Sequence, residues 1–114
     1  MNIKVYDQQK NIICEIKEGK GNMKEIDDYH NLIYEGEYLN GERNGKGKEY
    51  KYGKLIFEGE YLNGLRNGKV KEYYINIINK KLTLLFEGEY KNGKKWNGKG
   101  YDENGNIIYN ICIK

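Results

Sequence analysis

The most regular feature of the chain is a five-residue pattern in which aromatic residues and glycine alternate with glutamate. It occurs three times, as Tyr34-Glu-Gly-Glu-Tyr38, Phe57-Glu-Gly-Glu-Tyr61 and Phe86-Glu-Gly-Glu-Tyr90. An alternation with a period of two is typical of a β-strand, which places successive side chains on opposite faces of a sheet. Each copy therefore predicts a strand with aromatic residues and glycine on one face and carboxylates on the other.

The segments that follow these copies predict tight turns and a repeating unit. The first two copies begin 23 residues apart, and they continue in parallel as Leu39-Asn-Gly-Glu-Arg-Asn-Gly45 and Leu62-Asn-Gly-Leu-Arg-Asn-Gly68. Asn-Gly pairs supply the positive φ angles that tight turns and strand bulges require. The sequence predicts an all-β fold with no helix, an elongated single-layer antiparallel meander of tandem β-hairpins with short strands.

Two departures from the repeat stand out. The third copy begins 29 residues after the second, so six extra residues fall near 75–82, and its loop at 92–98 holds one extra residue that lets Trp96 project. At about 4.8 Å between strands, the array is expected to be some 40–50 Å long. We expect a single domain over 1–114, with well-formed repeats at 34–56, 57–85 and 86–108 and partial or degenerate capping units at 1–33 and 109–114.

Composition supports a folded sheet with an unusual interior. Charged residues make up 32% of the chain, yet it contains 12 Tyr and 15 Gly; tyrosine supplies the large apolar surface that disordered chains lack. The net charge of +3 is too small to predict binding to nucleic acid. Cys14 and Cys112 lie far apart in the sequence. Because two distant cysteines do not make a disulfide framework, we interpret them as free thiols in a reducing compartment. With no long apolar run, we expect a cytoplasmic protein, either free or peripheral to a membrane.

The chain contains no recognisable catalytic set. His30 is the single histidine, which excludes catalytic and metal sites built on several histidines. The segments 41–46 and 102–105 lack residues that a phosphate loop or a calcium loop needs, and we interpret both as turns. The glutamate pairs recur in every unit beside lysines, which favours cross-strand charge pairing over glycosidase chemistry. We expect no enzyme activity, no cofactor and no metal.

The repeat resembles the MORN repeat, usually written around Tyr-x-Gly-x-Trp-x-x-Gly-x-x-x-Gly-x-Gly. The match covers roughly residues 30–110, with Tyr in place of the usual Trp at 38, 61 and 90, and Val70 in place of a glycine. The tyrosines keep an amphipathic ring, whereas Val70 suggests a locally different edge or contact. The resemblance implies an extended single-layer sheet and a scaffold or interaction module; phospholipid binding has been proposed for the family but is not general.

Two candidate binding surfaces follow from this pattern. A stripe of rings on one face either packs on itself over the glycines or forms a groove for an extended peptide, a helix or a second copy of the chain. Trp96 is either a local packing residue or a further contact. The ring positions are Tyr34, Tyr38, Phe57, Tyr61, Phe86 and Tyr90. Alternatively, a line of lysines attracts anionic lipid headgroups; these are Lys46, Lys48, Lys69, Lys71 and Lys99.

Overall fold

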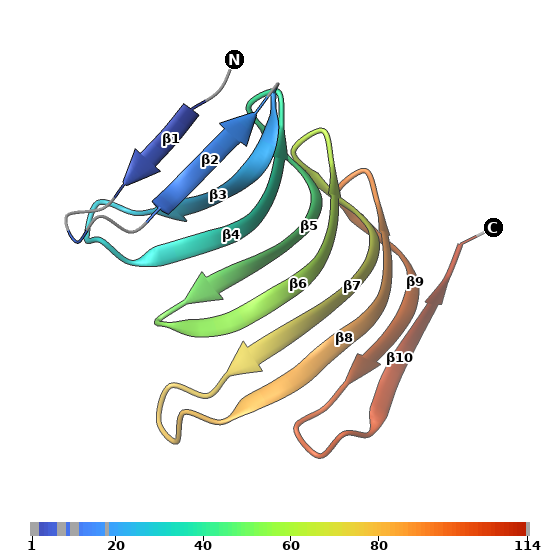
Figure 1. Ribbon diagram of the computed structural model, residues 1–114. Helices are drawn as coiled ribbons and strands as arrows, with labels where there is room; N and C mark the ends of the chain where they lie inside the picture. Colours follow the sequence, from blue (N-terminus) through green and yellow to red (C-terminus); the bar gives the residue numbers. More distant parts are fainter. Residues whose placement is uncertain (1–2, 7–8, 10–11, 18, 114) are drawn as a thin grey trace.

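The chain forms one antiparallel sheet in which every strand pairs with its neighbours in sequence (Figure 1). The computed structural model describes residues 3–6, 9, 12–17 and 19–113, so the predicted capping unit at 1–33 lies partly outside the described residues. Ten strands are present in this part of the chain: β1 (Ile3–Tyr6), β2 (Ile12–Lys17), β3 (Lys20–Ile26), β4 (Leu32–Leu39), β5 (Glu42–Lys51), β6 (Lys54–Leu62), β7 (Leu65–Ile75), β8 (Leu82–Lys91), β9 (Lys94–Tyr101) and β10 (Ile107–Cys112).

The sheet is a single curved layer measuring 45 × 38 × 17 Å. No helix occurs among the described residues, and so none there is long and apolar enough to cross a membrane. The strands bend along their length and stack side by side from one end of the array to the other (Figure 1). The predicted all-β meander of hairpins is therefore confirmed.

The central strands are longer than the sequence predicted. Strands β5 and β7 run for 10 and 11 residues, because only the first Asn-Gly pair of each unit makes a turn. At that pair, Asn40 and Gly41 have φ angles of 49° and 83°, as a two-residue hairpin turn requires. The second pair lies inside the strand, where the register shifts between Gly36 and Tyr38 and Gly45 takes up the positive φ of a bulge.

The register brings equivalent residues of successive units into rows that cross the strands. Because side chains alternate along each strand, the rings and the glycines lie on one face, which we call the aromatic face, and the glutamates between them lie on the other, the charged face. One row of the aromatic face, which we call the glycine row, consists of Met23, Gly36, Gly47, Gly59, Val70, Gly88 and Gly98.

Aromatic rings form the core of this single layer. Tyr34, Phe57 and Phe86 are fully buried, and Tyr61 and Tyr90 are buried as well. Their rings meet edge to face, with centroids 5.4 to 6.1 Å apart, an arrangement that aromatic pairs prefer. The ring of Tyr34 covers the glycine row: a Cβ on Gly47 would lie 2.3 Å from the Tyr34 hydroxyl oxygen. Glycine is required there because the ring occupies the space of a side chain.

Val70 is the exception in the glycine row, and it lies in the core. Its side chain is only 4% exposed, and it packs in the same cluster as Phe57. Val70 and Phe57 are equivalent to Gly47 and Tyr34 of the first unit. In the second unit the valine therefore accompanies a ring that has no hydroxyl group. The local difference predicted from Val70 is thus a packing contact in the middle of the sheet and not at an edge.

Hydrogen bonds along one rim tie each hairpin turn to the next. The side-chain oxygen of Asn44 accepts a hydrogen bond from the Asn63 amide at 3.1 Å, and Asn67 accepts one from Asn92 at 3.0 Å. Beside the second of these, the Gly93 amide donates to the Arg66 carbonyl at 2.9 Å. The second Asn-Gly pair of each unit therefore both forms a bulge and holds the turn of the following unit.

Candidate functional site

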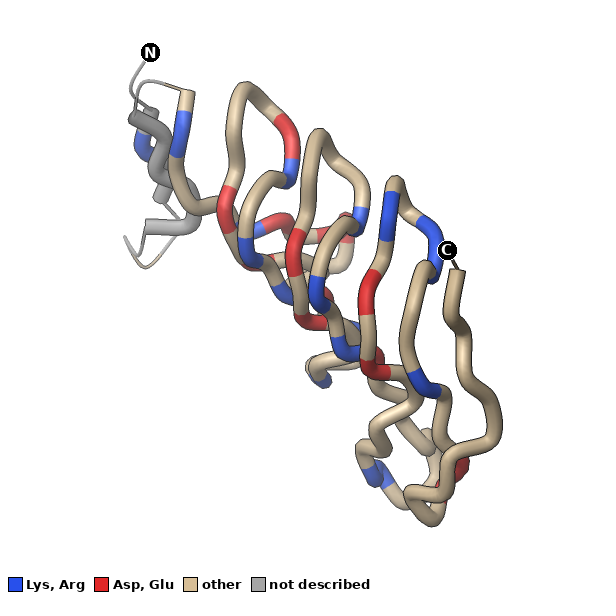
Figure 2. Tube along the Cα trace, turned by 90° about the vertical axis from the view of Figure 1, so that its right-hand side faces the viewer, with Lys and Arg blue, Asp and Glu red and all other residues tan. Residues whose placement is uncertain are grey.

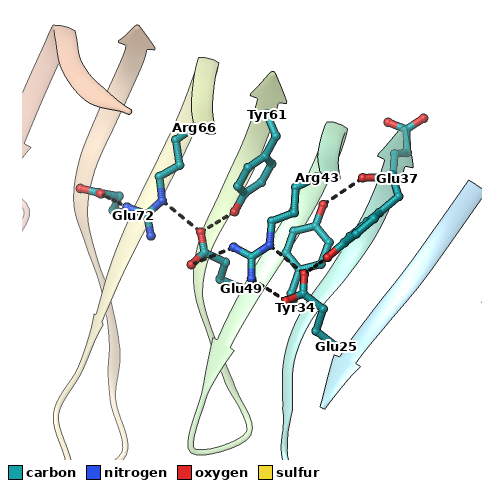
Figure 3. Close-up of polar contacts among 9 residues, drawn as sticks. Glu25, Tyr34, Glu37, Arg43, Glu49, Tyr61, Arg66 and Glu72 are labelled. Atoms are coloured by element: carbon teal, nitrogen blue, oxygen red, sulfur yellow. Dashed lines mark hydrogen bonds and ion pairs between the residues drawn. The ribbon is translucent and has the colours of Figure 1, made fainter. Parts of the chain in front are cut away.

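A ladder of ion pairs runs along the aromatic face beside the rings (Figure 3). We call it the ion-pair ladder; in order along the array, it consists of Glu25, Arg43, Glu49, Arg66, Glu72 and Lys95. Neighbouring charged atoms lie 2.8 to 3.8 Å apart, and every interior member contacts two groups of opposite charge. Three cations and three carboxylates leave the ladder with no net charge.

The same ladder covers the rings. The guanidinium carbon of Arg43 lies 4.2 Å from the ring centroid of Tyr34, that of Arg66 lies 3.9 Å from Phe57, and the Lys95 ammonium lies 4.7 Å from Phe86. These are cation–π distances. Lys95 takes the place of the arginines in the third unit, because it pairs with Tyr90 as Arg43 pairs with Tyr38 and Arg66 with Tyr61. Each of the three rings packs against a cation, and the rings of Tyr34 and Phe86 also lie against glycine backbone.

Tyrosine hydroxyls complete the ladder by donating to its carboxylates. Tyr38 donates to Glu25, Tyr61 to Glu49 and Tyr90 to Glu72. Burial on its own would raise the pKa of Glu25, but hydrogen bonds from Arg43 and Tyr38 and the charge of Arg43 outweigh it and lower that pKa. Burial and the bond to Glu25 raise the pKa of the Tyr38 hydroxyl to about 12. The Glu25 carboxylate is therefore charged and the Tyr38 phenol neutral at physiological pH.

The structure places the predicted ring stripe in the interior. Of the six stripe positions, five are buried and offer no surface to a partner, while Tyr38 is partly accessible and donates to Glu25. Trp96 is also partly exposed and lies 4.4 Å from the Lys91 ammonium. The sequence left two alternatives for the stripe, rings that pack on one another or an open groove. On this face the rings pack on one another. The recurring Arg in Asn-Gly-x-Arg-Asn-Gly was the available signal for the ladder that covers them.

The charged face carries lysine and glutamate in alternation. One row crosses the strands in the order Lys24, Glu35, Lys48, Glu58, Lys71, Glu87 and Lys99. Charged positions of opposite sign follow one another from strand to strand in Figure 2. Side chains directly opposite each other in neighbouring strands attract when their charges differ. The repeated glutamates thus lie opposite lysines, as the sequence predicted, but among the described residues of this face only Lys24 and Glu35 come within ion-pair distance, at 3.9 Å.

A groove of about 850 Å³ lies on the charged face and crosses strands β3 to β7. We call it the charged groove. Its floor is formed at Met23, Gly36, Gly47, Gly59 and Val70, and its walls are the charged side chains to either side. The walls contain Lys24, Lys46, Lys48, Lys69, Lys71, Glu35, Glu58 and Glu60. Five lysines against three glutamates give the groove a net charge of +2.

The lysines predicted to contact lipid lie on this face. Lys46, Lys48, Lys69 and Lys71 line the charged groove, and Lys99 continues the row beyond it. Each of them has a glutamate opposite it in a neighbouring strand, such as Glu60 beside Lys46 and Glu89 beside Lys69. The structure therefore gathers the five lysines but mixes them with carboxylates, so they do not form a uniformly basic surface.

The turns on the rim opposite the Asn-Gly turns expose apolar side chains. Tyr29, Tyr52, Ile77 and Ile78 are between 67% and 90% exposed, each at the tip of a turn. The six-residue insertion forms an ordered turn, in which the Asn76 side chain accepts a hydrogen bond from the Ile78 amide at 2.9 Å. Such separate tips project outward, whereas the charged groove has a floor and two walls.

The described residues bring together no group that resembles a catalytic or metal site. No cluster of three or more metal-ligating side chains occurs among them. His30 lies exposed in a turn with a φ angle of 66°, as the sequence suggested for a turn residue. Cys112 is an exposed free thiol, and the side chain of Cys14 lies outside what the structure describes.

Comparison of the chain with family models, with curated proteins and with solved structures gives no significant match. The resemblance to the MORN repeat therefore stays a prediction that rests on the repeat sequence. The charged groove and the ion-pair ladder are features of this chain's own geometry.

Proposed function

We propose that this protein is a non-catalytic interaction module that holds a segment of another protein in the charged groove. The observation that carries the proposal is the groove itself, a hollow of about 850 Å³ that spans five strands with both walls built from polar side chains. In the described part of the opposite face, the rings are buried under the ion-pair ladder. A scaffold role also agrees with what the MORN resemblance implies.

Binding to anionic lipid is the weaker candidate. Phosphate-rich membranes attract proteins through clusters of basic residues that lie close together without acids between them. On the charged face, Glu35 and Glu58 flank Lys48 in the adjacent strands, and Glu58 and Glu87 flank Lys71. A protein segment carrying charges of its own fits such a mixed surface better than a lipid layer.

Site-specific photo-crosslinking in the source cells tests the proposal. A photoreactive amino acid at position 46 lies on the groove wall, and one at position 29 lies outside the groove lining, at the exposed tip of the turn between β3 and β4. We expect a discrete crosslinked partner from position 46 only, and we expect Lys48→Glu with Lys71→Glu to abolish it. A crosslink to a second copy of the chain identifies self-association.

A crosslinked product from position 29 alone, or one from position 46 that survives both charge reversals, contradicts the proposal. Circular dichroism of the reversed variant provides the control for folding, since both lysines are exposed and outside the core.

A further inference from the structure

The lysines of the charged groove repeat with the unit. Lys24, Lys48 and Lys71 lie in one row on β3, β5 and β7, and Lys46 and Lys69 occupy the other wall on β5 and β7. Neighbouring strands lie about 4.8 Å apart, so cations on alternate strands recur about every 9.6 Å. The groove therefore presents positive charge at a fixed interval along the axis of the array.

Most of these ammonium groups have no carboxylate bound to them. Within the described residues, Lys24 pairs with Glu35 at 3.9 Å, whereas no ion pair within 4 Å forms at Lys46, Lys48, Lys69 or Lys71. Two of the groove glutamates are engaged elsewhere: Glu58 accepts from the Tyr73 hydroxyl at 2.8 Å, and Glu60 accepts from the Lys69 amide at 2.7 Å. Four cations thus remain open to an incoming anion.

The shape of the groove suits an extended ligand. It crosses five strands, which span about 19 Å. Its floor at Gly36, Gly47 and Gly59 is bare backbone, because glycine has no side chain. A single extended chain can lie along this floor between the two walls.

The interval of the cations selects the conformation of that chain. A polyproline II helix has three residues per turn and rises about 3.1 Å per residue, so every third side chain returns to the same side after about 9.3 Å. In a β-strand, side chains on one side recur about every 6.6 Å, which falls out of step with cations about 9.6 Å apart. Only the first conformation matches the unit spacing to within a few tenths of an ångström.

We propose that the charged groove binds an acidic segment in the polyproline II conformation, with a carboxylate at every third residue, running along the array axis. This inference rests on the proposed interaction function and assigns the chemistry of the partner. Carboxylates of the segment pair with Lys48, Lys71 and the lysines of the other wall, and its small residues lie over Gly36, Gly47 and Gly59.

The test is a fluorescence anisotropy titration with three labelled nine-residue peptides. The first contains three Glu-Pro-Pro repeats, the second has the same composition with its glutamates adjacent, and the third contains three Lys-Pro-Pro repeats. We expect saturable binding of the first peptide that weakens with added salt, at least about tenfold weaker binding of the second, and none of the third.

Matched variants connect the binding to the groove. Lys48→Gln with Lys71→Gln is expected to weaken binding of the first peptide about three- to tenfold, since each exposed ion pair contributes modestly. Lys54→Gln with Lys94→Gln removes the same charge from exposed positions outside the groove and is expected to leave binding unchanged.

Equal binding of the first two peptides, equal effects of the two variants, or no binding of the first peptide at about 1 mM overturns this inference. A partner that still crosslinks from position 46 then shows that the interaction function stands and that only the assigned chemistry is wrong. If neither experiment finds an occupant of the groove, the proposed function fails with it.

Discussion

At the scale of single residues, each unit places an aromatic ring and a glycine in one shared space. In the first unit, the Tyr34 hydroxyl lies over Gly47 and donates to the Glu37 carbonyl at 3.2 Å. In the second unit, the ring is Phe57 and the glycine has become Val70, whose side chain is buried. In these two units the phenolic hydroxyl and the valine side chain occupy equivalent places, whereas the third unit has Phe86 over Gly98 and neither group.

Replacing Gly47 with valine tests this pairing. Gly47→Val is expected to lower the free energy of unfolding by about 1–3 kcal/mol, because the new Cβ meets the buried ring of Tyr34. In the Tyr34→Phe background the loss is expected to be smaller, since the hydroxyl is gone. Urea denaturation of the two single variants and the double variant measures the coupling. Additive effects of the two substitutions would show that ring and glycine do not compete.

The tyrosines give a second prediction at this scale. Burial raises the pKa of six of the twelve tyrosines, and for Tyr38 and Tyr73, which also donate to carboxylates, the pKa rises to about 12. Because folding raises these pKa values, the stability that the neutral phenols contribute is complete below pH 10 and is lost as the pH rises toward 12. We expect tyrosinate absorbance to develop in two phases, the later one coinciding with loss of the circular dichroism signal. A single phase near pH 10 with the fold intact would be inconsistent with the buried phenols.

At the scale of strands, the ion-pair ladder joins one hairpin to the next. Arg66 on β7 contacts Glu49 on β5 at 3.0 Å and Glu72 on its own strand at 3.1 Å, and its guanidinium covers Phe57. Exposed ion pairs contribute little to stability, whereas removing one partner of a buried pair is costly. The side chains of Glu49 and Glu72 are 18% and 13% exposed, which places this pair between the two limits.

Arg66→Gln is therefore expected to destabilise the protein by about 1–3 kcal/mol. Arg66→Lys is expected to recover part of the loss, because Lys95 occupies the equivalent position in the third unit. Lys69→Gln, on the same strand but exposed, is the control and should change stability by less than about 0.5 kcal/mol. Equal losses for Arg66→Gln and Lys69→Gln in thermal or urea denaturation would refute a stabilising role of the ladder.

The asparagine links between turns give a prediction at the same scale. Asn67→Ala removes the acceptor of the Asn92 amide, and a loss of about 1 kcal/mol is expected. Asn67→Asp keeps an acceptor oxygen and should retain most of the stability. Hydrogen exchange of the Asn92 amide distinguishes the cases: faster exchange is expected in Asn67→Ala only. Unchanged exchange in both variants would show that the turn is held by other contacts.

The sequence predicted these elements unevenly. The alternation in Tyr34-Glu-Gly-Glu-Tyr38 was sufficient for strand and face, because burial of one face fixes the register of a strand. It did not show that the Asn-Gly pair at 44–45 lies inside β5, since a bulge and a turn demand the same positive φ. The recurring arginine was a signal for the ladder, but its partners were not predictable, because Glu25 and Arg43 meet only through the pairing of β3, β4 and β5.

At the scale of the whole molecule, one layer of strands performs two tasks on its two faces. Glycine allows the rings to lie against the backbone, and the cations of the ladder cover them, so the aromatic face acts as the core without a second layer. The charged face then remains open along the array, with a groove whose cations repeat at the interval of the unit. The repeat that builds the fold thereby also sets the spacing of the cations in the charged groove.

Nuclear magnetic resonance with a soluble paramagnetic probe tests this division of the two faces most directly. The probe broadens signals of protons that it can approach. We predict strong broadening of the side-chain methylenes of Lys46, Lys48 and Lys71 and little broadening of the ring protons of Tyr34, Phe57 and Phe86. Ring protons broadened as strongly as the lysine methylenes would contradict a closed aromatic face, and with it the account given for this protein.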